Sequence, residues 1–201
     1  MANFVTNRIT LIGNDAIKEL SKEINRRFNE DRHLNNNNSD TSQVGRLLFG
    51  LSGEAAYLSD KLSAKWVHVD GGLEEDEPLR LISGWRPVFE IQSHILECAS
   101  KIDPHVIVYM EYDDEMPNFV GVSYITLEDD RIIEFDIETD LSNCLVAYDG
   151  DYENEFARNQ ETNEYEQVLN WEDVWEIVSE NRREAFEAMK ARYSWVTDAM
   201  Y

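Results

Sequence analysis

The stretch RIIEFDIETD, residues 131–140, alternates between apolar and acidic side chains. Successive side chains of a β-strand point to opposite faces, so this period of two predicts a strand with one apolar and one acidic face. Neighbouring acids on that face would lie about 6.7 Å apart. We expect this strand to form the edge of a sheet, where charged side chains discourage edge-to-edge aggregation. The apolar face comprises Ile133, Phe135 and Ile137, and the acidic face comprises Glu134, Asp136, Glu138 and Asp140.

Charge is the strongest global feature of this 201-residue chain. The formal net charge at pH 7 is −23, and it is unevenly distributed. Residues 1–70 contain nine acidic and nine basic residues, whereas residues 103–166 contain nineteen acidic residues and two basic ones, Arg131 and Arg158. A field of this sign repels nucleic acid and acidic membrane surfaces and attracts basic partners. Solubility alone is the competing explanation.

The first 140 residues predict a regular order of strands and helices. Hydrophobic period and bounding turn residues indicate strands at 4–12, 65–70, 79–85, 105–112, 119–127 and 132–138. Helices are indicated at 15–30, behind an Asn14 or Asp15 cap, and from Pro87 onward, with an inner stripe of Val88, Ile91, Ile95 and Ile102. The order is therefore strand–helix–strand twice, followed by two more strands, with an insert at about residues 35–64.

The remainder of the chain differs from the first 140 residues. Residues 141–167 are acidic and poorly periodic, whereas residues 171–193 have the period of a long helix. Aromatic side chains at helical spacing are usually core, so we expect this helix to pack on the sheet, with packing on a partner chain as the alternative. Its stripe comprises Trp171, Trp175, Val178, Phe186, Met189 and Tyr193, and Trp195 and Tyr201 are possible further anchors.

Four segments carry a resemblance to a known family: MANFVTNRITLIG, LSAKWVHVDG, LISGWRPVFEIQSHI and VYMEYDDEMPNFVGVSYI. Together they resemble the YubB-like (Api-type) proteins of plasmids and bacteriophages over roughly residues 1–127. The insert departs from the pattern because it lacks a Trp-Gly pair before Lys65, and the chain after Asp140 lies outside the resemblance. The residues that match are Asn3, Val5, Asn7, Lys65, Trp66, Trp85, Pro87, Tyr112, Phe119 and Gly121.

The resemblance implies an α+β fold with a ferredoxin-like βαββαβ core. Two antiparallel strands would extend the sheet, and a C-terminal helical appendage would follow. We therefore expect a ferredoxin-like domain at residues 1–140, including the insert, and an acidic segment with a long helix at residues 141–201. The resemblance implies no catalytic activity, and function has to be argued from sites.

Enzymatic and metal-binding motifs are weak in this chain, and no cofactor is expected. GLSGE at residues 50–54 has Glu54 where a nucleophile elbow requires glycine. DGDYENE at residues 149–155 starts like a calcium loop but has Asn154 at the glycine position. The four histidines are far apart without metal-ligand spacing, and the common phosphate-binding loops are absent from the sequence. We predict a protein without catalytic or metal-binding residues, expected to be cytoplasmic because the sequence shows no secretion signal or membrane span.

The sharper hypothesis for the acidic strand is mimicry of a nucleic-acid backbone. A carboxylate about every 6.7 Å is comparable with two phosphate steps of about 3.4 Å each. Such a surface would block a basic host or defence protein in the cytoplasm of a host cell, without binding nucleic acid or membrane directly. A scaffold subunit that self-associates is the alternative, and a divalent-metal hydrolase is a third. The predicted partner-binding residues are Glu128, Asp129, Asp130, Glu134, Asp136, Glu138, Asp140, Trp171 and Trp175.

Overall fold

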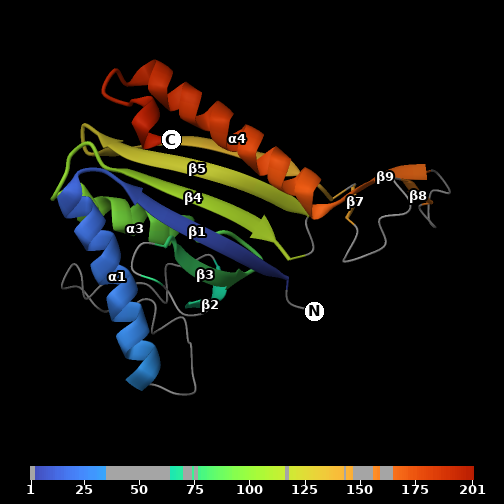
Figure 1. The fold of residues 1–201 in the computed structure, drawn as a ribbon, viewed down its shortest axis with the longest axis horizontal. Coiled ribbons are helices and arrows are strands. Elements are labelled where there is room, and N and C mark those ends of the chain that lie inside the picture. The colour runs from blue at the N-terminus through green and yellow to red at the C-terminus, as the bar shows by residue number, and fades with distance from the viewer. Residues whose placement is uncertain are drawn as a thin grey trace.

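The computed structural model describes residues 3–34, 64–69, 74, 77–115, 118–142, 144–146, 156–158 and 165–201. Over these residues the chain is an α+β protein whose centre is a six-stranded antiparallel sheet (Figure 1). Residues 35–63 of the predicted insert, the GLSGE stretch and the DGDYENE stretch lie outside the described residues. No helix among the described residues is long and apolar enough to cross a membrane.

The six strands of the large sheet follow the spatial order β2-β3-β1-β4-β5-β6. Strand β1 is therefore central, and it pairs antiparallel with both β3 and β4. The last three strands follow one another as two hairpins, which places β6 at the edge. The strands span Phe4–Ile12 (β1), Lys65–Val69 (β2), Leu79–Gly84 (β3), Ile107–Asp114 (β4), Phe119–Glu128 (β5) and Arg131–Asp140 (β6).

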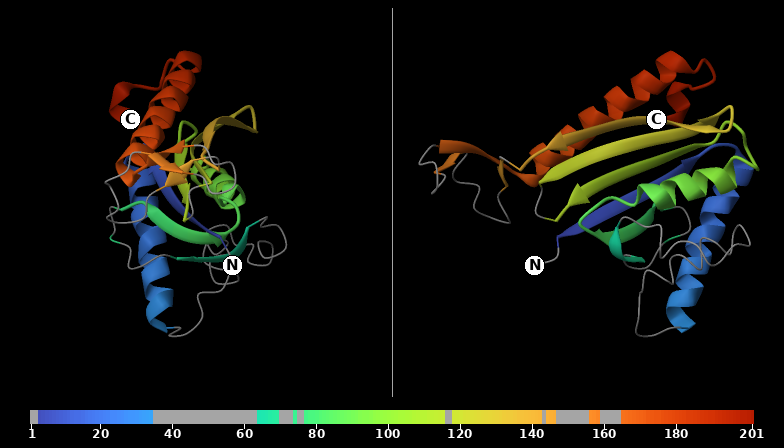
Figure 2. Two further views of the ribbon diagram at one scale, coloured as in Figure 1. Left: turned by 90° about the vertical axis from the view of Figure 1, so that its right-hand side faces the viewer. Right: turned by 180° about the vertical axis from the view of Figure 1, so that it is seen from behind.

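One face of the sheet is covered by helices α1 (Asp15–Leu34) and α3 (Phe89–Ala99), as Figure 2 shows from behind. The odd-numbered residues of β1, among them Val5 and Ile9, face these helices and are fully buried. The inner stripe of α3, including Ile91 and Ile95, packs on the same core. This packing explains why both helices have the apolar period that the sequence shows.

The opposite face is covered by the C-terminal helix α4 (Trp171–Arg192), which lies along β5 and β6 (Figure 1). A second core forms there, in which Tyr124 of β5 and Phe186 of α4 are fully buried. Because β4 and β5 lie between both helical layers, their side chains are buried on both faces. The prediction that the long helix packs on the sheet is confirmed.

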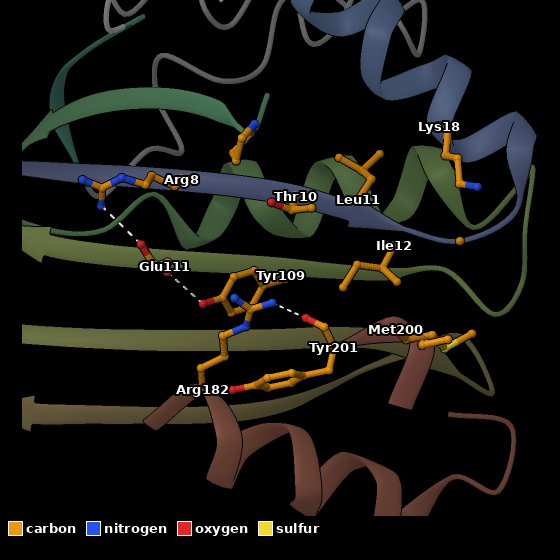
Figure 3. Close-up of a pocket in the computed structure, with 13 residues that line it drawn as sticks. Arg8, Thr10, Leu11, Ile12, Lys18, Tyr109, Glu111, Arg182, Met200 and Tyr201 are labelled. Atoms are coloured by element: carbon orange, nitrogen blue, oxygen red, sulfur yellow. Dashed lines mark hydrogen bonds and ion pairs between the residues drawn. The ribbon is translucent and has the colours of Figure 1, made fainter. Parts of the chain in front are cut away.

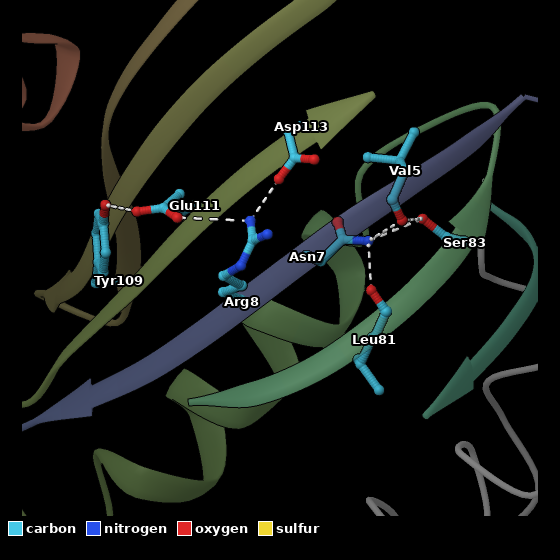
Figure 4. Close-up of polar contacts among 8 residues, drawn as sticks. All are labelled: Val5, Asn7, Arg8, Leu81, Ser83, Tyr109, Glu111 and Asp113. Carbon is cyan, nitrogen blue, oxygen red and sulfur yellow. Dashed lines mark hydrogen bonds and ion pairs between the residues drawn. The ribbon is translucent and has the colours of Figure 1, made fainter. Parts of the chain in front are cut away.

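The buried side chain of Asn7 fixes the junction between β3 and α3 (Figure 4). Its Nδ2 donates to the Leu81 carbonyl at 3.2 Å and to Ser83 Oγ at 3.0 Å. Its Oδ1 accepts the backbone N–H of Val88, just before α3, at 3.0 Å. The exposed Trp85 lies in this junction with a φ of 73°. The Trp85 N–H donates to the Asn3 carbonyl at 2.9 Å, and Ser83 Oγ donates to the Arg86 carbonyl at 2.6 Å. These bonds at and beside Trp85 hold its left-handed conformation in place.

The strands and helices of residues 4–140 agree with the predictions to within a few residues, and Asn14 caps α1 by accepting the N–H of Ala16 at 2.9 Å. Three features differ. Ile102 lies beyond the end of α3 and is exposed, so it does not belong to the inner stripe. Trp175, predicted to lie in the stripe of the C-terminal helix, is also exposed. The segment predicted to be poorly periodic contains three short strands of a second sheet: β7 (Leu145–Val146), β8 (Phe156–Arg158) and β9 (Tyr165–Leu169).

Candidate protein-binding site on strand β6

Strand β6 is the last strand of the sheet and exposes an unbroken row of acids. Phe135 and Ile137 pack against the α4 core, and Asn181 of α4 donates to Thr139 Oγ1 at 2.9 Å. The four even-numbered acids point to the other face, which is the face that carries α3, and all four are exposed. The predicted edge position and the alternation of the two faces are confirmed. We name Glu134, Asp136, Glu138 and Asp140 the acidic strip.

Glu138 is held in place by a tyrosine from two strands away. The hydroxyl of Tyr112, on β4, donates to Glu138 Oε2 at 3.2 Å. Gly121 of β5 lies between them in the register of the sheet, paired with Tyr112 on one side and with Glu138 on the other. A β-carbon at position 121 would overlap the Tyr112 ring. Glycine therefore lets the Tyr112 ring cross β5 and reach the acidic strip.

Replacing Gly121 with alanine is expected to lower the free energy of unfolding by about 1–3 kcal/mol, because the added methyl group displaces a fully buried Tyr112. Urea denaturation followed by circular dichroism measures this change. Ser123→Ala, two residues along the same face, adds no atoms and serves as the control. A loss in G121A no larger than in S123A would contradict the contact between Gly121 and Tyr112.

The acids of the strip differ in their electrostatic environments. Partial desolvation of its carboxyl raises the pKa of Asp136. Partial burial and then repulsion by Asp136 raise the pKa of Glu134. Hydrogen bonds from Ser142 instead lower the pKa of Asp140, whose Oδ1 accepts the Ser142 N–H at 2.8 Å. Desolvation thus disfavours the charged forms of Glu134 and Asp136, with repulsion from Asp136 as the smaller cause for Glu134, and a bound cation would favour both charged forms.

Replacing Asp136 with asparagine is expected to stabilise the protein at pH 7. The folded-state pKa of Asp136 is raised, so ionisation of this carboxyl opposes folding above that pKa and has no effect below the unfolded-state pKa. The advantage of D136N should therefore be present at neutral pH and vanish as the pH falls below about 3.9. Denaturant titrations of both proteins across this range measure the difference. A D136N protein that is less stable at pH 7 would contradict the desolvation of the Asp136 carboxyl.

The turn between β5 and β6 extends the negative surface, but only in part. Asp129 and Asp130 are exposed and have φ angles of 50° and 60°, as a tight hairpin turn requires. Glu128 is instead in an ion pair with Arg192 of α4. Of the three acids of this turn that were predicted to bind a partner, Glu128 therefore already pairs with a cationic side chain of the same protein.

The two tryptophans among the predicted partner-binding residues, Trp171 and Trp175, lie on the opposite side of the sheet from the acidic strip. Trp171 is partly buried against the α4 core, and Trp175 stacks on the guanidinium of Arg8 at 4.9 Å. Arg8 is in turn ion-paired with Asp113 and, at 3.5 Å, with Glu111 (Figure 4). The structure therefore does not bring the predicted acids and tryptophans together in one surface.

An aromatic residue that sequence reasoning missed lies nearer to the strip. Phe89, at the start of α3, is 37% exposed and packs edge-to-face on Tyr112 with 5.5 Å between ring centroids. Tyr112 in turn contacts Glu138 and the ring of Phe119. Phe89 is thus linked to the acidic strip through Tyr112, and an exposed aromatic ring can stack on the guanidinium of a bound arginine. The only sequence signal was the position of Phe89 just inside a helix N-terminus.

A cleft of about 450 Å³ lies on the α4 face (Figure 3). The guanidinium of Arg182 lies there between the rings of Tyr109, at 5.1 Å, and Tyr201, at 4.6 Å. The other basic residues of the cleft have acidic partners, since Arg8 pairs with Glu111 and Lys18 pairs with Asp15 at 3.0 Å. These pairs leave the cleft without a strong preference for either sign of charge.

Groups suited to metal binding or nucleophilic catalysis are sparse where the structure describes the chain. In that part of it no three side chains of His, Cys, Asp or Glu are arranged to hold a metal ion. The thiol of Cys98 lies 3.6 Å from His94 Nε2, but burial raises the pKa of Cys98 and so disfavours the reactive thiolate. Arg26 and Arg27, two neighbouring basic residues of α1, both pair with Glu23.

Comparison of the chain with protein-family models, curated proteins and solved structures finds no match.

Proposed function

We propose that this protein is a non-enzymatic binding protein that blocks a basic surface of another protein with its acidic strip. The observation that carries the proposal is the exposed row of four carboxylates on β6, fixed at regular intervals by pairing with β5. A spacing of about 6.7 Å resembles two phosphate steps of a nucleic-acid duplex. The partner is then a basic nucleic-acid-binding protein, and the chain acts as an inhibitor that mimics DNA or RNA.

A ferredoxin-like core within the sheet is part of the proposal. The strand order β2-β3-β1-β4, antiparallel throughout, supports it, as do α1 and α3, which connect these strands on one face. Two residues of the YubB-like resemblance also have specific contacts, since Asn7 joins β1 to β3 and Tyr112 crosses Gly121. On this basis we infer a plasmid or phage accessory protein that acts in the cytoplasm of a host cell against a host or defence factor.

The rigidity of the strip supports blocking of a partner over a merely solubilising surface. Strand β6 is anchored on one face by α4 and along its length by β5, and Glu138 is held by Tyr112. Carboxylates fixed in this way lose little conformational entropy on binding a cation, whereas flexible surface acids gain little from an ion pair.

Affinity capture from a host lysate tests the proposal. The native protein is compared with a variant of the strip, E134Q/D136N/E138Q/D140N, at low and high salt. A control, E172Q/E176Q/E180Q/E184Q, changes the net charge equally on the exposed face of α4. We expect the native protein and the control, but not the strip variant, to recover a basic nucleic-acid-binding protein that salt releases. Equal recovery by all three proteins, or no recovery by any, would contradict the proposal.

A scaffold role with self-association is the second candidate, and one observation favours it. Two large apolar side chains are exposed on the α4 side of the sheet. Phe4 of β1 is 37% exposed, and Trp175 of α4 is 38% exposed. Such a surface suits an apolar contact between copies of the chain, whose strength would change little with salt. Sedimentation equilibrium at two salt concentrations distinguishes this candidate, because it predicts a dimer that persists in both.

A further inference from the structure

Strand β6 has a long and regular main-chain edge in addition to its charges. Its ten residues pair with β5 in continuous register, from Arg131 opposite Glu128 to Asp140 opposite Phe119. No other strand within the described residues pairs with its outer side. The opposite edge, β2, has only five residues and a register shift between Lys65 and His68. Short or bulged edges resist the addition of strands, whereas a long regular edge is a template for it.

The two faces of β6 specify what an added strand would have to carry. On the α3 face its side chains would lie beside the acidic strip, where opposite charges in cross-strand pairs are favourable. On the α4 face its side chains would lie beside Ile133, Phe135 and Ile137, which are half-buried and leave apolar surface at the edge. The complementary strand therefore alternates basic and apolar residues.

We propose that β6 binds an extended segment of its partner as a further antiparallel or parallel strand, with Lys or Arg at alternate positions and apolar residues between them. This inference rests on the proposed function and names the form in which the basic partner is recognised. Main-chain hydrogen bonds supply affinity in such an addition, and the alternating side chains supply specificity. A second copy of β6 added antiparallel about a two-fold axis perpendicular to the sheet is unfavourable, because its carboxylates would lie opposite those of the first copy.

The test uses the full chain and a synthetic ten-residue peptide that alternates arginine and valine. Two further peptides carry the same number of N-methyl groups, one on the arginines and the other on the valines. In a β-strand, alternate residues direct their N–H groups to the same side. One methylated peptide should therefore lose at least about tenfold in affinity while the other changes by less than about twofold, because only one set of N–H groups bonds to β6.

Amide hydrogen exchange of the protein gives an independent readout of the same pairing. The unmodified peptide should slow exchange at alternate amides of β6, because they gain carbonyl partners. Equal affinity of the two methylated peptides, together with unchanged exchange along β6, would overturn the strand addition.

If peptide binding nevertheless requires the acidic strip, as judged by E134Q/D136N/E138Q/D140N, the proposed function stands. Equal binding of the unmodified peptide by the native protein and the strip variant would instead overturn recognition by charge. In that case, the difference in affinity between the two methylated peptides would still show whether the peptide pairs with the edge of β6.

Discussion

Replacing Phe186 with alanine is expected to lower the free energy of unfolding by about 3–5 kcal/mol. Phe186 is fully buried between α4 and the sheet, and its ring lies 5.8 Å from that of Tyr124 and 5.1 Å from that of Tyr201. Removing the ring leaves a cavity in the second core, which lies directly behind β5 and β6. Guanidinium denaturation at pH 7 measures the loss.

The exposed residue Ile102 provides the control for this prediction. Ile102→Ala should change the free energy of unfolding by no more than about 0.5 kcal/mol, because its side chain is 47% exposed beyond the end of α3. A loss below about 1 kcal/mol for F186A would mean that α4 does not pack on the sheet as a structural layer. The support of β6 by α4 would then have to be abandoned as well.

Neutralising the acidic strip is expected to weaken binding of a basic partner by roughly 30- to 1,000-fold. Each exposed ion pair contributes about 0.5–1 kcal/mol, so four pairs contribute about 2–4 kcal/mol when they act independently. The measurement is a titration of the captured partner with E134Q/D136N/E138Q/D140N at low salt. The loss of the Glu134 and Asp136 carboxyls, whose pKa values are raised, should offset the loss of ionised Asp140, whose pKa is lowered by hydrogen bonds from Ser142. The strip variant should therefore be about as stable as the native protein.

The control for this titration is a variant that loses the same number of negative charges from α4 instead of the acidic strip. The variant E172Q/E176Q/E180Q/E184Q alters exposed residues of α4 and should weaken binding only through the long-range field, which salt screens. An equal loss of affinity in both variants would show that the total charge of the protein, and not the acidic strip, attracts the partner.

The sequence predicted the elements whose pattern is local. RIIEFDIETD and the N-terminal strand follow a strict period of two, and the stripes of α1 and α3 follow helical spacing, so the β1 to β6 framework could be predicted without tertiary information. The short strands β7, β8 and β9 could not, because two to five residues are too few to establish a period.

The site was predicted only in part, because its remaining members depend on long-range contacts. The acids of β6 could be assigned to one face from their spacing alone. The contact of Tyr112 with Glu138 spans 26 residues and depends on the absence of a side chain at Gly121. Trp175 follows the helical stripe in sequence, yet it lies at the border of the α4 core, where it stacks on Arg8 and stays half-exposed. A helical period does not reveal where the neighbouring sheet ends.

Competition with nucleic acid is the most direct test of mimicry by the acidic strip. The captured partner, bound to a fluorescent duplex of about 20 base pairs, is titrated with the native protein, and fluorescence anisotropy follows release of the duplex. Mimicry predicts complete displacement by the native protein, displacement by the α4 control, and much weaker displacement by E134Q/D136N/E138Q/D140N. A ternary complex, in which the partner retains its duplex while it binds the native protein, would contradict the proposal that the acidic strip occupies the nucleic-acid site.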